Sequence, residues 1–86
     1  MPAAFTYGTD LDVISVESSG ALVQRFFNAS GWHTLELGKG CKPGAIPVVL
    51  HNYAHETGRL DVFAEATSGM GHAWFSNNAW LFEILA

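Results

Sequence analysis

Short apolar segments separated by turn residues fill the chain, and this pattern predicts strands rather than helices. Around Leu11 and Val13, and again around Leu60 and Val62, apolar residues alternate with polar or small ones, as they do in a half-buried strand. Groups of Gly, Ser, Asn and Asp between the segments favour tight turns. The expected strands are residues 3–7, 11–16, 21–27, 31–37, 47–52, 60–65, 70–76 and 79–85.

The expected strands form two copies of one four-strand unit. The matching pairs are Leu11 and Leu60, Asp12 and Asp61, Val13 and Val62, Phe26 and Phe75, Asn28 and Asn77, and Trp32 and Trp80. The spacing between partners is 49 residues up to Asn77 and falls to 48 at Trp80. Upstream of these pairs the spacing is 45, so the second copy holds four additional residues in its first turn, near residues 55–58. Length differences confined to turns are typical of tandem structural units.

Four strands in about 40–45 residues are the period of a β-propeller blade. We therefore expect blade 1 at residues 1–38, a linker rich in Gly and Lys at residues 39–46, and blade 2 at residues 47–86. Two blades leave two apolar sheet faces bare, and about four or more are needed to close a ring. The expected fold class is all-β, with two four-stranded blades per chain that homo-oligomerisation of three chains completes to a closed, six-bladed propeller. Rings of four or eight blades stay open as alternatives.

The composition agrees with a surface that another copy partly covers. Apolar residues make up 49% of the chain and charged residues only 14%, and three Trp, six Phe and two Tyr are many aromatic residues for one small core. Four Lys and Arg against eight Asp and Glu argue against binding to nucleic acid or to anionic membranes. No apolar run approaches the roughly 20 residues of a membrane-spanning helix, so membrane insertion is not expected. We expect a soluble chain with no visible signal peptide, and its compartment stays unknown.

Two parts of the chain resemble the blade motif of bacterial PLL-type β-propeller lectins: residues 20–32 with residues 35–38 after them, and residues 58–64. The two-repeat length is similar to that of the small fucose-binding lectins of plant-pathogenic and opportunistic bacteria. Those lectins assemble as trimers into six-bladed propellers and hold the sugar in clefts between adjacent blades. The resemblance implies a multivalent lectin that binds fucose or a similar monosaccharide and needs no cofactor. Its partners would be fucosylated or related glycans and further copies of itself.

The resemblance also places a sugar site on each copy. In copy one, Gln24 falls at the position of the acidic group that accepts sugar hydroxyls, and Phe27 and Trp32 fall at the two stacking Trp positions. The corresponding positions of copy two hold Ala73, Ser76 and Trp80. A sugar has an apolar face that stacks on an aromatic ring and hydroxyls that need fixed donors and acceptors, which is why such positions matter.

The sequence departs from the lectin pattern in both copies, above all at the two positions that clamp fucose. Asp12 and Asp61 stand where the small fucose lectins carry an Arg, so the Arg/Glu pair that clamps fucose is absent from both copies. The PLL-type pattern has aromatic residues and His near the centre of the third strand, and copy two carries His72 and Trp74 in that stretch, but at shifted positions. The candidate sugar-binding residues are Trp32, Trp80, Gln24, Phe27, Arg25, His72 and Trp74.

Each candidate also has a purely structural interpretation. Trp32 and Trp80 are equally compatible with closing the core of a blade. A solvated strand position explains Gln24 well, and an ion pair between blades explains Arg25. A structural role is also preferred for Asp12 and Asp61, as carboxylates that brace turns, and for Phe26 and Phe75, as core residues.

Neither catalysis nor metal binding is indicated. The four His residues lack metal-ligand spacing, and no nucleophile elbow is present. Cys41 is the single Cys, so an internal disulfide is excluded, and we expect a small loop residue. The leading hypothesis is a non-enzymatic carbohydrate-binding protein. The alternatives are a structural or designed propeller fragment whose main property is symmetric self-assembly, and a scaffold for other proteins.

Overall fold

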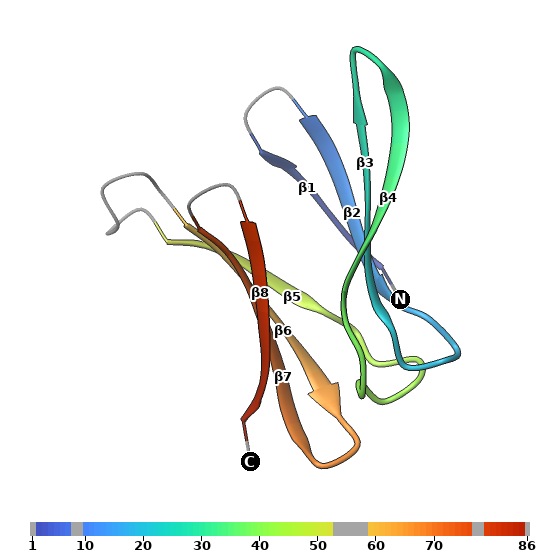
Figure 1. Cartoon of the computed structure of the whole chain (residues 1–86), viewed down its shortest axis with the longest axis vertical. Coiled ribbons are helices and arrows are strands. Elements are labelled where there is room, and N and C mark those ends of the chain that lie inside the picture. The colour runs from blue at the N-terminus through green and yellow to red at the C-terminus, as the bar shows by residue number, and fades with distance from the viewer. Residues whose placement is uncertain (1, 8–9, 53–58, 77–78, 86) are drawn as a thin grey trace.

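Figure 1 shows the computed structural model, which describes residues 2–7, 10–52, 59–76 and 79–85. It contains two antiparallel sheets of four strands, and no helix occurs within these ranges. The strands are β1 (Ala3–Tyr7), β2 (Asp10–Val16), β3 (Leu22–Asn28), β4 (Gly31–Gly38), β5 (Val48–Asn52), β6 (Arg59–Ala66), β7 (Gly69–Ser76) and β8 (Ala79–Leu85). The all-β class and the two four-strand units are therefore confirmed, and every strand boundary lies within one residue of the expected one.

Each sheet is a meander in which consecutive strands pair, in the orders β1-β2-β3-β4 and β5-β6-β7-β8. Two tight turns of the first sheet contain glycines with positive φ, Gly20 at +87° and Gly31 at +106°. Glycine adopts this region without the steric cost of a Cβ atom, so it lets the chain reverse between neighbouring strands. The local turn chemistry thus sets the meander order.

The strand registers correct the residue-by-residue match between the copies. Asp12 lies opposite Phe26 in the first sheet, whereas Asp61 lies opposite Trp74 in the second. Trp74 therefore takes the place of Phe26, and the expected match of Phe26 with Phe75 is wrong. The second copy is one residue shorter than the first in the hairpin before β7. Phe75 corresponds to Phe27, so the spacing between matching residues has already fallen to 48 within β7.

The first-turn insertion agrees with the registers. Tyr7 pairs with Asp10 in the first sheet, and Asn52 pairs with Arg59 in the second. The second turn is therefore four residues longer than the first, as expected. The residues of this turn, 53–58, lie outside the described part of the chain.

Successive side chains of a strand point to opposite faces, so each sheet has two distinct faces. One face carries the repeated aspartate, Asp12 or Asp61, and is called the Asp face here. The other carries the repeated valine, Val13 or Val62, and is called the Val face.

The two sheets stack with unlike faces in contact. Ile14 and Leu22, on the Asp face of the first sheet, have no exposed surface. They form one apolar cluster with Val62, Ala64 and Ala73 on the Val face of the second sheet. Strand β1 contacts β5 and strand β4 contacts β8, so corresponding strands of the two sheets lie next to each other (Figure 1). The arrangement is head to tail, because the first sheet contributes its Asp face and the second its Val face.

The segment between the sheets is part of the core. Cys41 belongs to the buried cluster, and its backbone N–H donates to the carbonyl of Gly20 at 3.0 Å. The N–H of Lys42 donates to the carbonyl of Glu65 at 2.8 Å, so the segment is tied to both sheets. Cys41 lies outside the named strands, as expected of a loop residue, and its side chain is also part of the buried cluster between the sheets. Burial raises the pKa of its thiol.

The other two faces carry exposed apolar side chains beside charged ones. On the Val face of the first sheet, Leu11, Phe27 and Trp32 are 45%, 46% and 58% exposed. The large exposed residues on the Asp face of the second sheet are Val48, Leu50, Met70, Leu81 and Leu85. Within the described residues, no helix has the length and apolar character needed to cross a membrane.

Candidate functional site

The junction between the sheets contains three linked polar side chains. Nε2 of Gln24 on β3 donates to Oδ1 of Asp12 on β2 at 2.7 Å, and Nε1 of Trp80 on β8 donates to Oε1 of Gln24 at 3.0 Å. Asp12 and Gln24 are diagonal neighbours on the Asp face, which brings their side chains within reach. Gln24 is only 7% exposed, so its interpretation as a solvated strand residue is wrong.

The counterpart of Gln24 in the second sheet is His72. His72 lies opposite Phe63, as Gln24 lies opposite Ile14. The expected counterpart, Ala73, points to the other face and is buried in the inter-sheet cluster. The two copies therefore differ at this position by an amide in one and an imidazole in the other.

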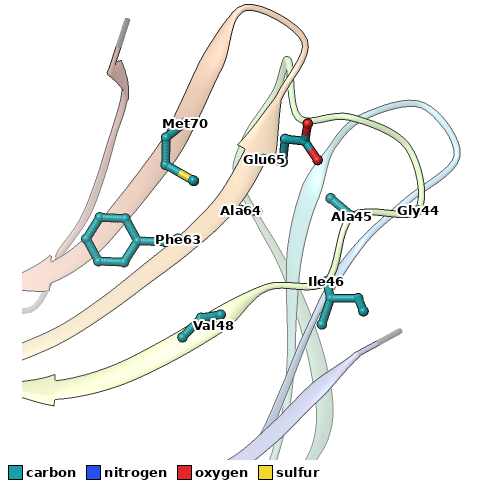
Figure 2. Close-up of a pocket in the computed structure, with 8 residues that line it drawn as sticks. All are labelled: Gly44, Ala45, Ile46, Val48, Phe63, Ala64, Glu65 and Met70. Atoms are coloured by element: carbon teal, nitrogen blue, oxygen red, sulfur yellow. The ribbon is translucent and has the colours of Figure 1, made fainter.

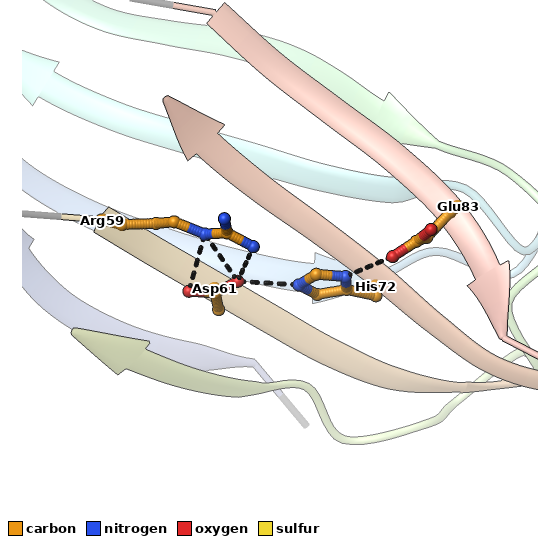
Figure 3. A network of polar contacts seen from close by, with 4 residues as sticks. All are labelled: Arg59, Asp61, His72 and Glu83. Carbon is orange, nitrogen blue, oxygen red and sulfur yellow. Dashed lines mark hydrogen bonds and ion pairs between the residues drawn. The ribbon is translucent and has the colours of Figure 1, made fainter. Parts of the chain in front are cut away.

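His72 belongs to an ionic network that crosses β6, β7 and β8 (Figure 3). Arg59 donates to Asp61 from Nε at 3.1 Å and from Nη2 at 2.9 Å. Nε2 of His72 lies 2.7 Å from Oδ1 of Asp61, and Nδ1 lies 2.8 Å from Oε2 of Glu83. Ionised carboxylates only accept hydrogen bonds, so both contacts are hydrogen bonds when both ring nitrogens carry a proton.

Asp61 is the central acid of this network. Burial acts to raise its pKa, but the hydrogen bonds from Arg59 and His72 and the charges of those two groups outweigh burial. The pKa of Asp61 therefore lies below its usual value. Asp61 thus braces the neighbouring strand, as Asp12 does. The turns that we expected the two aspartates to brace contain residues 8–9 and 53–58, which lie outside the described part of the chain.

Aromatic rings extend the network across the Asp face of the second sheet. The ring of His72 stacks on Phe63, with centroids 4.6 Å apart, and on Trp74, at 4.8 Å. The guanidinium carbon of Arg59 lies 5.5 Å from the centroid of Trp74, which is within cation–π range. The aromatic rings and the charged groups therefore form one continuous surface on this face of the sheet.

Each sheet carries the same Phe–Trp pair on its Val face. The rings of Phe27 and Trp32 are 5.3 Å apart at 54°, and those of Phe75 and Trp80 are 5.4 Å apart at 55°. Trp80 packs against the core and contacts Gln24, whereas Trp32 is 58% exposed. The same pair is thus covered by a neighbouring sheet in one copy and open in the other. Phe75, and not Ser76 as expected, is the counterpart of Phe27.

The ion pair of Arg25 lies on the open Val face of the first sheet. Nη2 of Arg25 is 2.6 Å from Oε1 of Glu17, and Nη1 donates to Oγ of Ser15 at 3.4 Å. Both partners belong to the same copy, so Arg25 forms its ion pair within one four-strand unit and not between two units as expected. The pair is exposed and contributes little to stability.

A hollow of about 460 Å³ lies over the Asp face of the second sheet (Figure 2). Its lining residues are Gly44, Ala45, Ile46, Val48, Phe63, Ala64, Glu65 and Met70. It adjoins the ionic network, because Phe63 contacts His72. Apart from Glu65, every lining side chain is apolar or absent, so the hollow suits an apolar occupant.

The candidate sugar-binding residues fall in three places. These are the inter-sheet junction with Gln24 and Trp80, the open Val face of the first sheet with Arg25, Phe27 and Trp32, and the open Asp face of the second sheet with His72 and Trp74. The expected core residues Phe26 and Phe75 are only half-buried. No single place brings all candidates together.

Two members of the ionic network, Arg59 and Glu83, were not singled out from the sequence. The alternation of β6 places Arg59 and Asp61 on one face, and this was an available signal. Glu83 reaches His72 only through the pairing of β7 with β8, which requires the correct register. Among the described residues, no three or more His, Cys, Asp or Glu side chains are arranged to hold a metal ion.

Comparison with known proteins assigns no family to this chain. No family model matches it, and neither a curated protein nor a solved structure matches it significantly. The geometry of its own residues therefore carries the functional argument.

Proposed function

We propose that this protein is a non-catalytic, multivalent carbohydrate-binding protein that uses the clefts between neighbouring sheets. The observation that carries the proposal is the junction where Trp80 of the second sheet meets the Gln24–Asp12 pair of the first. An aromatic ring offers a stacking surface for the apolar face of a sugar, and an oriented amide and carboxylate offer partners for its hydroxyls. Fucose or a similar monosaccharide is the proposed ligand, on the resemblance of the blade segments.

Self-assembly into a ring of three chains and six blades is part of the proposal. It is supported by the two faces whose exposed apolar side chains neither sheet of the described part of the chain covers. Each chain contributes two Phe–Trp pairs, so a ring multiplies the sites. Weak contacts at single sites then sum to high avidity on a glycan-coated surface.

Calorimetric titration with fucose, together with a glycan array, tests the sugar-binding part. Saturable binding is expected for the assembled wild type, with native mass spectrometry reporting the oligomer with and without fucose. A folded oligomer that binds nothing on the array contradicts the lectin assignment.

One observation favours a second function. The amide of Gln24 is bonded on both sides, and the N–H of Trp80 donates to it, so these groups hold the two sheets together without a ligand. This supports a structural unit whose main property is symmetric self-assembly. Both functions predict the same oligomer, but only the carbohydrate-binding function predicts saturable binding in the sugar titration.

A further inference from the structure

Each sheet ends in two edge strands, which pair with a neighbour on one side only. The edges are β1 and β4 in the first sheet and β5 and β8 in the second. An edge strand leaves a row of backbone N–H and C=O groups unpaired, so it is able to pair with a strand of another chain. Natural sheets block this pairing with short edge strands, Pro, Lys or a bulge. An edge that lacks every block is therefore a candidate docking surface.

Three of the four edges carry a block. Strands β1 and β5 have five residues each, and each directly follows a proline, Pro2 or Pro47. In β4, a register shift against β3 leaves Leu37 without a cross-strand partner, as in a β-bulge, and Lys39 follows the strand. These three edges are thus poor templates for a further strand.

Strand β8 carries none of these blocks. Its seven residues, Ala79–Leu85, pair with β7 one to one and without a shift in register. The strand contains no Pro, Gly, Lys or Arg, and its only charged residue is Glu83. Leu81, Ile84 and Leu85 are 49%, 38% and 42% exposed. Strand β8 is therefore an apolar edge without protection (Figure 1).

The outer side of β8 is held ready for a partner. Within the described residues, β8 pairs with β7 alone, and none of the backbone hydrogen bonds outside the sheets reaches it. In an antiparallel edge strand, every second residue directs its N–H and C=O away from the sheet. Trp80 and Phe82 pack against the core, and Glu83 is bonded to His72. The strand is thus fixed in its extended form, which lowers the entropic cost of adding a strand.

We infer that β8 is the docking edge for an extended segment of another protein, which adds to the second sheet as an outer strand. Main-chain hydrogen bonds supply affinity in this mode of recognition, and side chains beside the edge select the segment. On the Asp face the segment meets Leu81, Glu83 and Leu85, so it carries apolar residues around one Lys or Arg opposite Glu83. The ring proposed above uses sheet faces and not edges, so this inference goes beyond the proposed function and does not depend on it.

The charge of Glu83 argues against a second copy as the occupant. Strand β8 has no basic residue to place beside this carboxylate. If two β8 strands paired antiparallel over their full length, Phe82 would face itself and the two Glu83 side chains would be diagonal neighbours. Like charges on adjacent strands disfavour this pairing, whereas a basic residue is attracted. The net charge of −4 on the whole chain also favours a basic segment.

A capped synthetic peptide, Ile-Thr-Lys-Val-Val-Thr-Thr, tests the inference, because its Lys faces Glu83 in an antiparallel pairing. We expect saturable binding of one peptide per chain by native mass spectrometry and slower amide hydrogen exchange in β8. The same peptide with Glu in place of Lys is expected to bind about ten-fold more weakly.

N-methylation of the peptide separates strand pairing from simple apolar contact. Two peptides carry N-methyl groups on alternate residues, one in each phase. The peptide that loses the N–H groups facing β8 is expected not to bind, and the other is expected to bind. Equal binding of both would show that side chains alone make the contact and would overturn the inference.

Variants of the protein locate the edge. Leu81→Lys places a natural block on β8 and should weaken the Lys peptide about ten-fold. Leu35→Lys is the matched control, because Leu35 lies on the edge strand β4 and is 42% exposed, and it should bind as the wild type does. Glu83→Gln should bind the Lys and Glu peptides equally. Circular dichroism checks each fold, and Ile84→Lys replaces Leu81→Lys if the latter does not fold.

Three further results would count against the inference. They are no binding of the Lys peptide, exchange protection in β4 in place of β8, and a peptide-free dimer that Leu81→Lys dissociates, which would make a second copy the occupant. A fucose titration of the same samples keeps the two proposals apart. Absence of sugar binding leaves the added strand standing, and absence of peptide binding leaves the lectin proposal standing.

Discussion

The indole N–H of Trp80 donates to the amide oxygen of Gln24 at 3.0 Å and so joins two sheets through residues 56 positions apart. The same amide donates to Asp12, which places one nearly buried side chain at the centre of the junction. A buried amide that is bonded on both sides fixes the relative placement of the elements that it joins.

Gln24→Ala is expected to lower the free energy of unfolding by about 2–4 kcal/mol, because it removes a hydrogen bond to a carboxylate and one to an indole. Urea unfolding followed by circular dichroism measures the loss. Arg25→Ala, the next residue along β3, is the control and should change stability by less than about 1 kcal/mol, since its ion pair is exposed. Equal losses for both variants would show that the junction does not depend on the amide.

Trp32→Ala is expected to remove the sugar sites that Trp32 lines, and so to lower the stoichiometry of binding, while the monomer stays folded, because the side chain is 58% exposed and contributes little to the core of its own chain. Calorimetric titration and native mass spectrometry on the same sample measure both properties. Trp32→Phe keeps an aromatic surface and should retain part of the binding. Trp80→Ala should instead cost about 3 kcal/mol of stability, since Trp80 packs against the core.

Stability is expected to fall with acid through Asp61. Its pKa is lower in the folded chain than in the unfolded one, so its contribution is fully present above the ordinary carboxyl value near about 3.9 and is lost as pH falls through the lowered value. Asp61→Asn should therefore be less stable at pH 7, by about 2 kcal/mol, and should show a flatter dependence between about pH 5 and 2. Urea unfolding at a series of pH values tests this. Glu36→Gln, in an exposed pair with Lys39, is the control and should keep the wild-type slope; the same slope in Asp61→Asn would contradict the assignment.

Gly20→Ala and Gly31→Ala separate backbone strain from a steric clash. Both residues have positive φ, which costs an alanine roughly 1–2 kcal/mol. A Cβ at Gly20 would also lie 2.7 Å from the carbonyl oxygen of Cys41, whereas nothing lies within 4 Å at Gly31. Thermal unfolding should show a clearly larger loss for Gly20→Ala, about 3 kcal/mol or more. Equal losses would mean that the linker is not packed against this turn.

The thiol of Cys41 is expected to react slowly with a thiol reagent in the folded protein. It is 1% exposed, and burial raises its pKa, so little of it is the nucleophilic thiolate. Reaction with an aromatic disulfide reagent should be at least about 100-fold faster in guanidinium, where the same single thiol is exposed. A fast reaction in native buffer would indicate that the two sheets separate readily.

The strands and the duplication could be predicted because they depend on local patterns. Alternation around Val13 and Val62 and turn residues such as Gly20 and Gly31 act over a few positions. The match of Phe26 with Phe75 failed because adjacent aromatic residues occur in both copies, and a shift of one residue moves every side chain to the other face. That shift assigned the wrong residue of copy two to the position of Gln24.

The candidate site was predicted only in its parts. Trp80 and Gln24 were both singled out, but their contact depends on how one sheet stacks on the other. Arg59 and Glu83 were not singled out, because each gains its role only beside His72. The Phe–Trp pair that contains Trp32 is exposed and the pair that contains Trp80 is covered, but the local sequence pattern does not distinguish them.

By itself, the sequence determined that the chain is all-β, that it holds two four-strand units, and where the strands and turns lie. These features depend on alternation and turn chemistry, which act between near neighbours. Only the tertiary structure decided which faces meet, that Gln24 corresponds to His72, and that one Phe–Trp pair is covered while the other is open. Register and stacking depend on contacts between residues far apart in the sequence, and a shift of one residue in a hairpin changes all of these contacts.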